Sequence, residues 1–157
     1  DMLLTNAAVN INKPRGSLES LDEVSEIFKA QPEETMLNFL KASIKTNKEE
    51  TEDIKKLHQA YSDGRFEELI PLLEETEQRT LKLVDTKYAK AMSNWLKNDL
   101  LIRRNLAWLP EIRKQSAKQS TLFAVGIAHL PSKKGLIELL RQEGYQVTPE
   151  PKVLIWQ

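Results

Sequence analysis

The feature that most constrains the fold is an uninterrupted apolar run at residues 121–126, Thr-Leu-Phe-Ala-Val-Gly, which ends in a glycine. A short apolar run bounded by a turn residue is typical of a strand that is buried on both faces of a sheet. A helix is predicted next, over residues 131–143, with Gly144 as the glycine that follows its last turn. Residues 145–148 are predicted to form a second short strand, and residues 153–156 a third. This order predicts a parallel strand–helix–strand unit.

Upstream of that run, apolar side chains recur at the spacing of amphipathic helices. We therefore predict a helical insertion over residues 20–118, followed by the strand–helix–strand unit over residues 119–157. The helices expected are residues 1–10, 21–30, 32–63 with an end at Asp63-Gly64, 66–77 kinked or begun again at Pro71, and 80–118 interrupted at Pro110. The predicted fold class is α/β, a helix-rich domain in which a few mainly parallel strands form an incomplete sheet.

Composition excludes several classes of function. The 23 basic and 23 acidic side chains cancel, so the chain lacks the basic excess of a nucleic-acid-binding or acidic-membrane-binding protein. The absence of cysteine excludes thiolate metal sites, catalytic cysteine and disulfides. No apolar run approaches the roughly 20 residues of a membrane-spanning helix. We therefore look for chemistry among histidine, carboxylate and arginine side chains.

The segment Gly126-Ile127-Ala128-His129 contains the sharpest candidate. Its histidine follows the predicted strand and precedes the predicted helix, so it would lie at the carboxyl end of the strand, where ligand sites of open α/β sheets gather. We expect Gly126 to allow a tight turn there. A histidine in that place can bind a metal through a neutral ring nitrogen or transfer a proton near neutral pH. The position equally suits a half-buried histidine that caps a helix, and the segment alone does not separate these alternatives.

Three segments together match a known pattern. An apolar strand, G-x-x-H-L, a helix and G-Y-x-V follow one another over residues 121–147. Upstream, Arg104-Asn105 and Trp108 form R-N-x-x-W, and Glu19 lies in Gly-Ser-Leu-Glu-Ser. This set resembles the TraB/GumN family of Tiki-like metallohydrolases, with Glu19 on the glutamate of the family's G-L-E-T segment. The resemblance spans most of the chain and is most specific over residues 98–148.

The resemblance implies a metal-dependent hydrolase, a peptidase in the Tiki proteins, and a likeness to erythromycin esterases. His129 would then be a ligand of a divalent metal ion or an acid/base, and Glu19 a metal ligand or general base. Arg104 would stabilise a developing oxyanion, and Asn105 would orient a neighbour. The implied substrate is a protein or peptide, and the implied compartment is the periplasm or cell envelope, with the cytoplasm left open.

The chain departs from the family pattern in its histidines. The family has two G-x-x-H motifs, whereas the only other histidine, His58, has no glycine three residues before it and is predicted to be solvated on a polar helix. We therefore expect a partial domain, the C-terminal portion, whose first motif would precede Asp1. Ser132 stands where the family has glycine.

A second hypothesis is a non-catalytic protein-interaction domain on the same scaffold, because resemblance of fold does not establish chemistry. The amphipathic helices of residues 20–118 would offer its partner surface. An incomplete sheet also leaves a strand edge that tends to pair with another chain, so we expect a homodimer or strand exchange.

Overall fold

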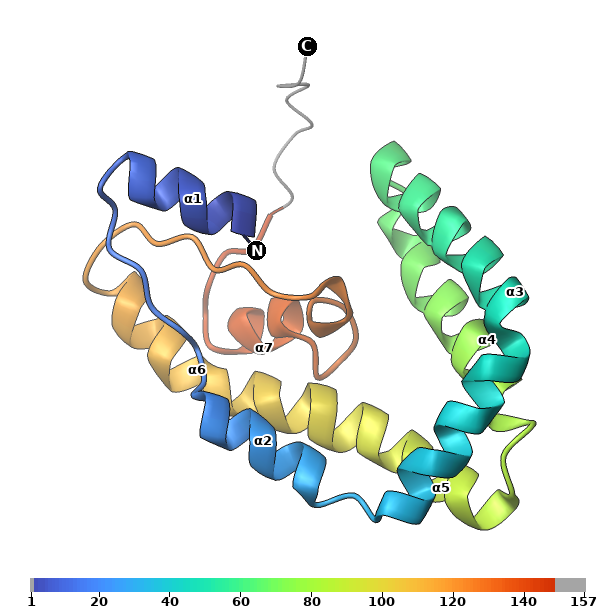
Figure 1. The fold of residues 1–157 in the computed structure, drawn as a ribbon. Helices are drawn as coiled ribbons and strands as arrows, with labels where there is room; N and C mark the ends of the chain where they lie inside the picture. The colour runs from blue at the N-terminus through green and yellow to red at the C-terminus, as the bar shows by residue number, and fades with distance from the viewer. Residues whose placement is uncertain (1, 149–157) are drawn as a thin grey trace.

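The computed structural model of the chain describes residues 2–148, the side chain of Phe66 excepted, and helices are its regular elements (Figure 1). They are α1 (Met2–Asn10), α2 (Leu21–Lys29), α3 (Glu33–Asp63), η1 (Phe66–Glu68), α4 (Leu69–Leu81), α5 (Thr86–Asn94), η2 (Trp95–Ile102), α6 (Arg103–Ser116), η3 (Ile127–His129) and α7 (Leu136–Gln142). Residues 2–148 contain no strand, so the predicted α/β class with an incomplete parallel sheet is wrong for this part of the chain.

The predicted strand at residues 121–126 is an extended segment without a partner strand. Phe123 and Val125 pack against the cluster between α6 and α7, whereas Leu122 on the other side is 78% exposed. The segment therefore buries one face against helices and not two faces within a sheet. A strand exists only where a neighbouring backbone completes its hydrogen-bond ladder, and an apolar run does not supply that neighbour.

Neither of the other two predicted strands is observed within residues 2–148. Residues 145–148 have no regular structure, and residues 153–156 lie outside the described part of the chain. The expectation of strand exchange therefore has no strand edge within residues 2–148 to support it.

The helix predicted over residues 131–143 begins later, at Leu136. Ser132 has a φ of 85°, which ends any helical continuation from η3. Gly135 approaches the backbone so closely that an added Cβ would lie 1.9 Å from the carbonyl oxygen of Pro131. Gly144 has a φ of 90° just after α7, as predicted for the residue that ends the helix.

A long helical run formed by α5, η2 and α6 supports the rest of the molecule and lies along the base of the view in Figure 1. The middle element, η2, is π-helical, and the Arg103 N–H donates to the carbonyl of Asn98, five residues earlier. A π segment places an extra residue in the turn and so redirects the side chains that follow. Residues on the two sides of η2 accordingly face different neighbours.

Two apolar clusters lie along this run. One packs Ile27 of α2 and Leu81 of α4 against Met92 and Trp95, and the Trp95 indole N–H donates to the Ile27 carbonyl at 3.1 Å. The other consists of Trp108, Leu109, Ile112, Leu136 and Leu139, which join α6 to α7. The second cluster underlies the candidate site.

Pro110 lies inside α6, so the predicted interruption at this residue is wrong. A proline in a helix interior costs about 3 kcal/mol. Leu109 and Ile112 are buried, and the burial of each side chain stabilises the fold by roughly 1.5–3 kcal/mol. The buried Trp108 adds further stability. Packing therefore outweighs the lost hydrogen bond, and the proline ring itself is exposed.

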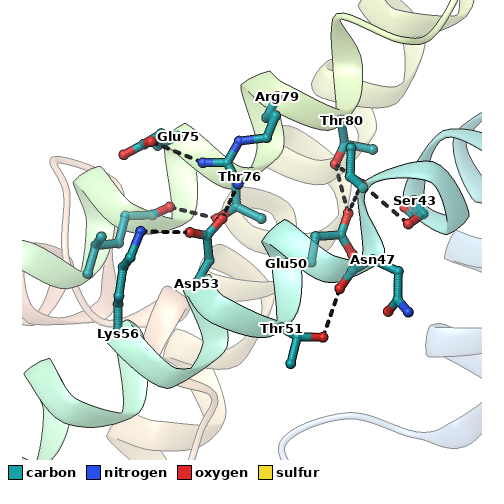
Figure 2. Close-up of polar contacts among 12 residues, drawn as sticks. Ser43, Asn47, Glu50, Thr51, Asp53, Lys56, Glu75, Thr76, Arg79 and Thr80 are labelled. Atoms are coloured by element: carbon teal, nitrogen blue, oxygen red, sulfur yellow. Dashed lines mark hydrogen bonds and ion pairs between the residues drawn. The ribbon is translucent and has the colours of Figure 1, made fainter.

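The α3–α4 hairpin projects from one end of the long run (Figure 1). Gly64, with a φ of 73°, ends α3 as predicted, and Pro71 lies in the first turn of α4, where its missing N–H has no helical partner to lose. Polar side chains join the two helices (Figure 2): Asp53 accepts hydrogen bonds from Thr76 and Arg79. Within residues 2–148, no helix is both long enough and apolar enough to cross a membrane.

Candidate functional site

Glu19 lies two residues before the first residue of α2, Leu21. Ser20 caps α2: its hydroxyl accepts the Glu23 backbone N–H at 3.2 Å, and the Glu23 carboxylate accepts the Ser20 backbone N–H at 2.6 Å. This capping box defines where α2 begins and how the chain enters it. Glu19, one residue earlier, is thereby turned toward α6, where its side chain is 18% exposed.

Arg104 on α6 forms a two-point ion pair with Glu19. Its Nη2 lies 2.6 Å from Oε1 and its Nε 3.0 Å from Oε2. Arg104 is also anchored to its own helix, because Nη1 donates to the Leu100 carbonyl at 3.1 Å. A planar guanidinium that meets a carboxylate through two parallel hydrogen bonds has a defined orientation as well as a charge.

Trp108 completes the surroundings of the Glu19 carboxylate. It lies one turn after Arg104, and its indole N–H donates to Oε2 of Glu19 at 3.1 Å. The Arg104 guanidinium carbon lies 4.9 Å from the centre of the Trp108 ring. The hydrogen bonds from Arg104 lower the pKa of Glu19 most, opposed by burial and assisted by the Arg104 charge and the Trp108 N–H. Glu19 is therefore ionised at neutral pH.

His129 is held by Asn105, which is only 2% exposed. Asn105 Nδ2 donates to the backbone carbonyls of Lys134 at 2.9 Å and His129 at 3.3 Å, so its amide oxygen faces the imidazole. That oxygen lies 2.7 Å from Nδ1 of His129. Because an amide oxygen only accepts, Nδ1 must carry the proton, and the neutral ring presents a lone pair at Nε2.

The free nitrogen of His129 faces the ion pair. Nε2 lies 3.4 Å from Nη1 of Arg104, and the imidazole packs against the Trp108 ring with centres 4.5 Å apart. Burial lowers the pKa of His129, the Arg104 charge lowers it further, and Glu19 partly offsets both. The imidazole is therefore neutral at pH 7 and able to accept a proton at Nε2.

The turn that carries His129 differs in detail from the sequence prediction. Gly126 has φ −60° and ψ 140°, an extended conformation open to any residue, and an added Cβ would make only ordinary contact with the His129 ring at 3.6 Å. The chain does turn tightly at Gly126, where the His129 N–H donates to the Gly126 carbonyl at 2.9 Å, but this turn does not need the conformational freedom of glycine. The unusual backbone lies at Ser132 and the close approach at Gly135, after the histidine.

Comparison with known proteins identifies the family of the chain. The sequence model of the TraB/PrgY/gumN family matches residues 1–149. The chain belongs to the TraB/PrgY/gumN family. No curated protein and no solved structure matched it. The resemblance drawn from the motifs is thus confirmed at the level of the family.

The TraB-family residues singled out in the sequence come together. Glu19, Arg104, Asn105 and His129 form one contact network, although Glu19 and Arg104 are 85 positions apart. Trp108, which was singled out only as part of R-N-x-x-W, also donates to Glu19, and its place one turn after Arg104 was the available signal. His58 is exposed on α3, as predicted.

The divalent metal expected for a TraB-family hydrolase does not fit the described residues alone. Both Glu19 oxygens already accept hydrogen bonds from Arg104 or Trp108, and a guanidinium cation lies against the His129 lone pair. Among residues 2–148, His, Asp and Glu side chains do not gather in a group of three that could hold a metal. A catalytic zinc commonly uses three protein ligands. The observed donors among residues 2–148 form an ion-paired acid/base cluster.

Proposed function

We propose that this TraB-family chain contributes an acid/base and oxyanion-binding cluster to a hydrolase that cleaves a carbonyl compound, with a peptide or ester as substrate. The observation that carries the proposal is the 2.7 Å contact between His129 Nδ1 and Asn105 Oδ1. It directs the Nε2 lone pair toward the Arg104 guanidinium, while burial and the Arg104 charge lower the pKa of His129 and favour the neutral ring that a general base requires.

In the proposed step, His129 Nε2 accepts a proton from water while that water oxygen bonds to the substrate carbonyl carbon. The carbonyl oxygen gains negative charge and is stabilised by the Nη1 group of Arg104. The same imidazolium then returns the proton to the departing amine or alcohol. The 3.4 Å contact between Arg104 and His129 is long for a hydrogen bond, so a water or a substrate oxygen can replace it at low cost.

Glu19 positions Arg104 in this proposal and does not act as the base. Its carboxylate is engaged on both oxygens and its pKa is lowered, so it is a poor proton acceptor near neutral pH. The proposed step is written for the side chains of this cluster. Assays with added Zn²⁺ and with EDTA test metal dependence separately.

The test compares two histidine variants. The purified protein would be assayed with p-nitrophenyl acetate and with a quenched fluorescent peptide library. We expect H129A to lower kcat/KM by about 10²–10⁴-fold, the usual contribution of a general base. H58A removes the exposed histidine of α3 and should leave the rate unchanged. Equal rates for H129A and the parent protein, with the same helical circular dichroism, would contradict the proposal, as would an inactive parent protein.

A second candidate is a non-catalytic protein-interaction domain. It is favoured by α1, in which Met2, Leu3 and Val9 are exposed and no residue is buried among those described. Such an apolar helix is suited to packing against another protein surface. The same assay separates the candidates, because an interaction domain would show no hydrolysis that depends on His129.

A further inference from the structure

A basic groove lies apart from the Glu19–His129 cluster, between the end of α4 and the side of α5 and η2. It is shallow, with a volume of about 950 Å³, and its lining shares no residue with that cluster. Lysine side chains form its rim: Lys82 from the end of α4, Lys87 and Lys90 from α5, and Lys97 from η2. Within residues 2–148, none of these lysines forms an ion pair, and no acidic side chain lines the groove.

Three acids lie close to the groove along the chain, Glu77, Asp85 and Asp99, and within residues 2–148 none of them forms an ion pair with its lysines. Asp85 caps α5 by accepting the backbone N–H of Lys87 at 3.0 Å. Glu77 accepts the hydroxyl of Ser93 at 2.9 Å. The chain as a whole has no net charge, so the positive character of this groove arises from where the lysines are placed. An uncompensated cluster of this kind attracts an anionic partner and steers its approach.

The floor of the groove is apolar and comes from three elements. Leu81 lies at the end of α4, Ala89 in α5 and Ile102 at the end of η2. Asn98, also in η2, adds a polar side chain, whose Nδ2 donates to Asn94 at 2.6 Å. A partner must therefore present apolar groups flanked by negative charges.

We propose that this groove binds an acidic peptide segment of a partner protein, one that carries apolar residues between its Asp and Glu side chains. The carboxylates would pair with the lysine rim and the apolar side chains would cover the floor. Two other anionic partners fit less well. A bilayer is flat and would not follow a concave surface. Single-stranded nucleic acid is held by stacking aromatic and arginine side chains, and the groove lining contains neither.

The test uses fluorescence anisotropy and charge-reversal variants of the whole chain. The probe is a fluorescein-labelled decapeptide of Asp, Glu and Leu, and its control has Asn and Gln in place of the acids. K90E/K97E reverses the charge of the rim. K41E/K45E changes the net charge equally on exposed positions of α3, away from the groove lining.

We expect the acidic peptide to bind the parent protein, and we expect its affinity to fall as salt is added. K90E/K97E should lower its affinity at least about tenfold, because two attractive pairs become repulsive, while K41E/K45E should change it by less than about twofold. The proposal is overturned by equal binding to K90E/K97E, by equal losses in both variants, or by no binding of the acidic peptide. Lysine-dependent binding of phosphatidylserine vesicles or an oligouridine in preference to the peptide also overturns it.

Discussion

Two buried polar networks in this chain differ in whether a polar group remains available to a ligand. In the α3–α4 hairpin, Asp53 is 4% exposed and accepts from Thr76, Arg79 and Lys56, all on the same two adjacent helices (Figure 2). The Glu19–His129 cluster is formed by Glu19 from the loop that leads into α2 and by residues of α6 and η3. Its His129 retains a lone pair that meets only a long contact from Arg104.

The difference separates a structural role from a chemical one. A fully paired network between neighbouring helices sets their register and has no group available to a ligand. A network that holds a neutral imidazole in one orientation and leaves its second nitrogen weakly engaged is prepared for proton transfer. The following predictions test this contrast, from the largest expected effect to the smallest.

Replacing Asn105 should disturb the cluster most. N105L leaves the His129 ring N–H and the carbonyls of His129 and Lys134 without their partner, and each loss costs about 1–3 kcal/mol. We expect a loss of about 3–5 kcal/mol in the free energy of unfolding, measured with urea. Asn47→Leu, at an exposed position of α3, should cost little.

N105D tests the orientation of the ring. It keeps an acceptor for Nδ1 but removes the donor to the two carbonyls. We expect the ring to remain protonated at Nδ1, as read from imidazole ¹⁵N shifts, although stability falls because a carboxylate oxygen would face the two carbonyls. A shift of the proton to Nε2 in N105D, or unchanged stability in N105L, would contradict the role assigned to Asn105.

Breaking the hairpin network should lower stability without affecting the proposed chemistry. D53L leaves part of the Arg79 guanidinium unpaired and leaves the Thr76 hydroxyl only its bond to the Leu72 carbonyl, so we expect a loss of about 1–3 kcal/mol in urea unfolding. Glu52→Leu breaks only the exposed pair with Lys55 and should cost less than about 1 kcal/mol. A loss of hydrolysis in D53L under conditions where the protein is folded would remove the contrast between the two networks.

Acidification should weaken the cluster around His129 before the hairpin. The pKa of His129 is lowered in the folded state, so its neutral form contributes stability above its unfolded value of about 6.5, and that contribution falls as pH drops toward the folded pKa. The pKa values of Glu19 and Asp53 are also lowered, so their contributions are lost only below about pH 4.

Amide hydrogen exchange at pH 7.5 and pH 5.0 measures this order. Protection in α6 and α7 should fall more than protection in α3 and α4. H129Q removes the titrating ring and should flatten the difference, whereas H58Q should not. Equal falls in both regions of the parent protein would show that His129 does not govern the acid response.

A small gain in stability is expected at Ser132. Its φ of 85° is strained for a residue with a side chain, and glycine removes roughly 1 kcal/mol of that strain. S132G also loses the contact from the Lys134 N–H to Oγ at 3.3 Å, so the net gain should be about 0.5 kcal/mol. Thermal unfolding measures the shift, and the opposite change, G144A at a φ of 90°, should lower the midpoint.

Local signals were enough for much of the fold. The left-handed Gly64 after α3 and Gly144 after α7 act over a single turn, so the sequence shows them directly. Such helix ends depend on side chains and backbone within a few residues of one another. The resemblance to the family, and not local spacing, indicated Glu19, Arg104, Asn105 and His129 as one set.

Only the tertiary structure decided what depends on distant partners. Whether residues 121–126 become a strand depends on a neighbouring backbone, and in residues 2–148 the apolar side chains of that segment meet helices α6 and α7 instead. The contact of the Trp108 indole with Glu19, 89 positions earlier, and the burial that keeps α6 intact through Pro110 are equally non-local. Hydrogen-bond ladders, desolvation and ion pairs take their strength from groups that the chain brings together only when it folds.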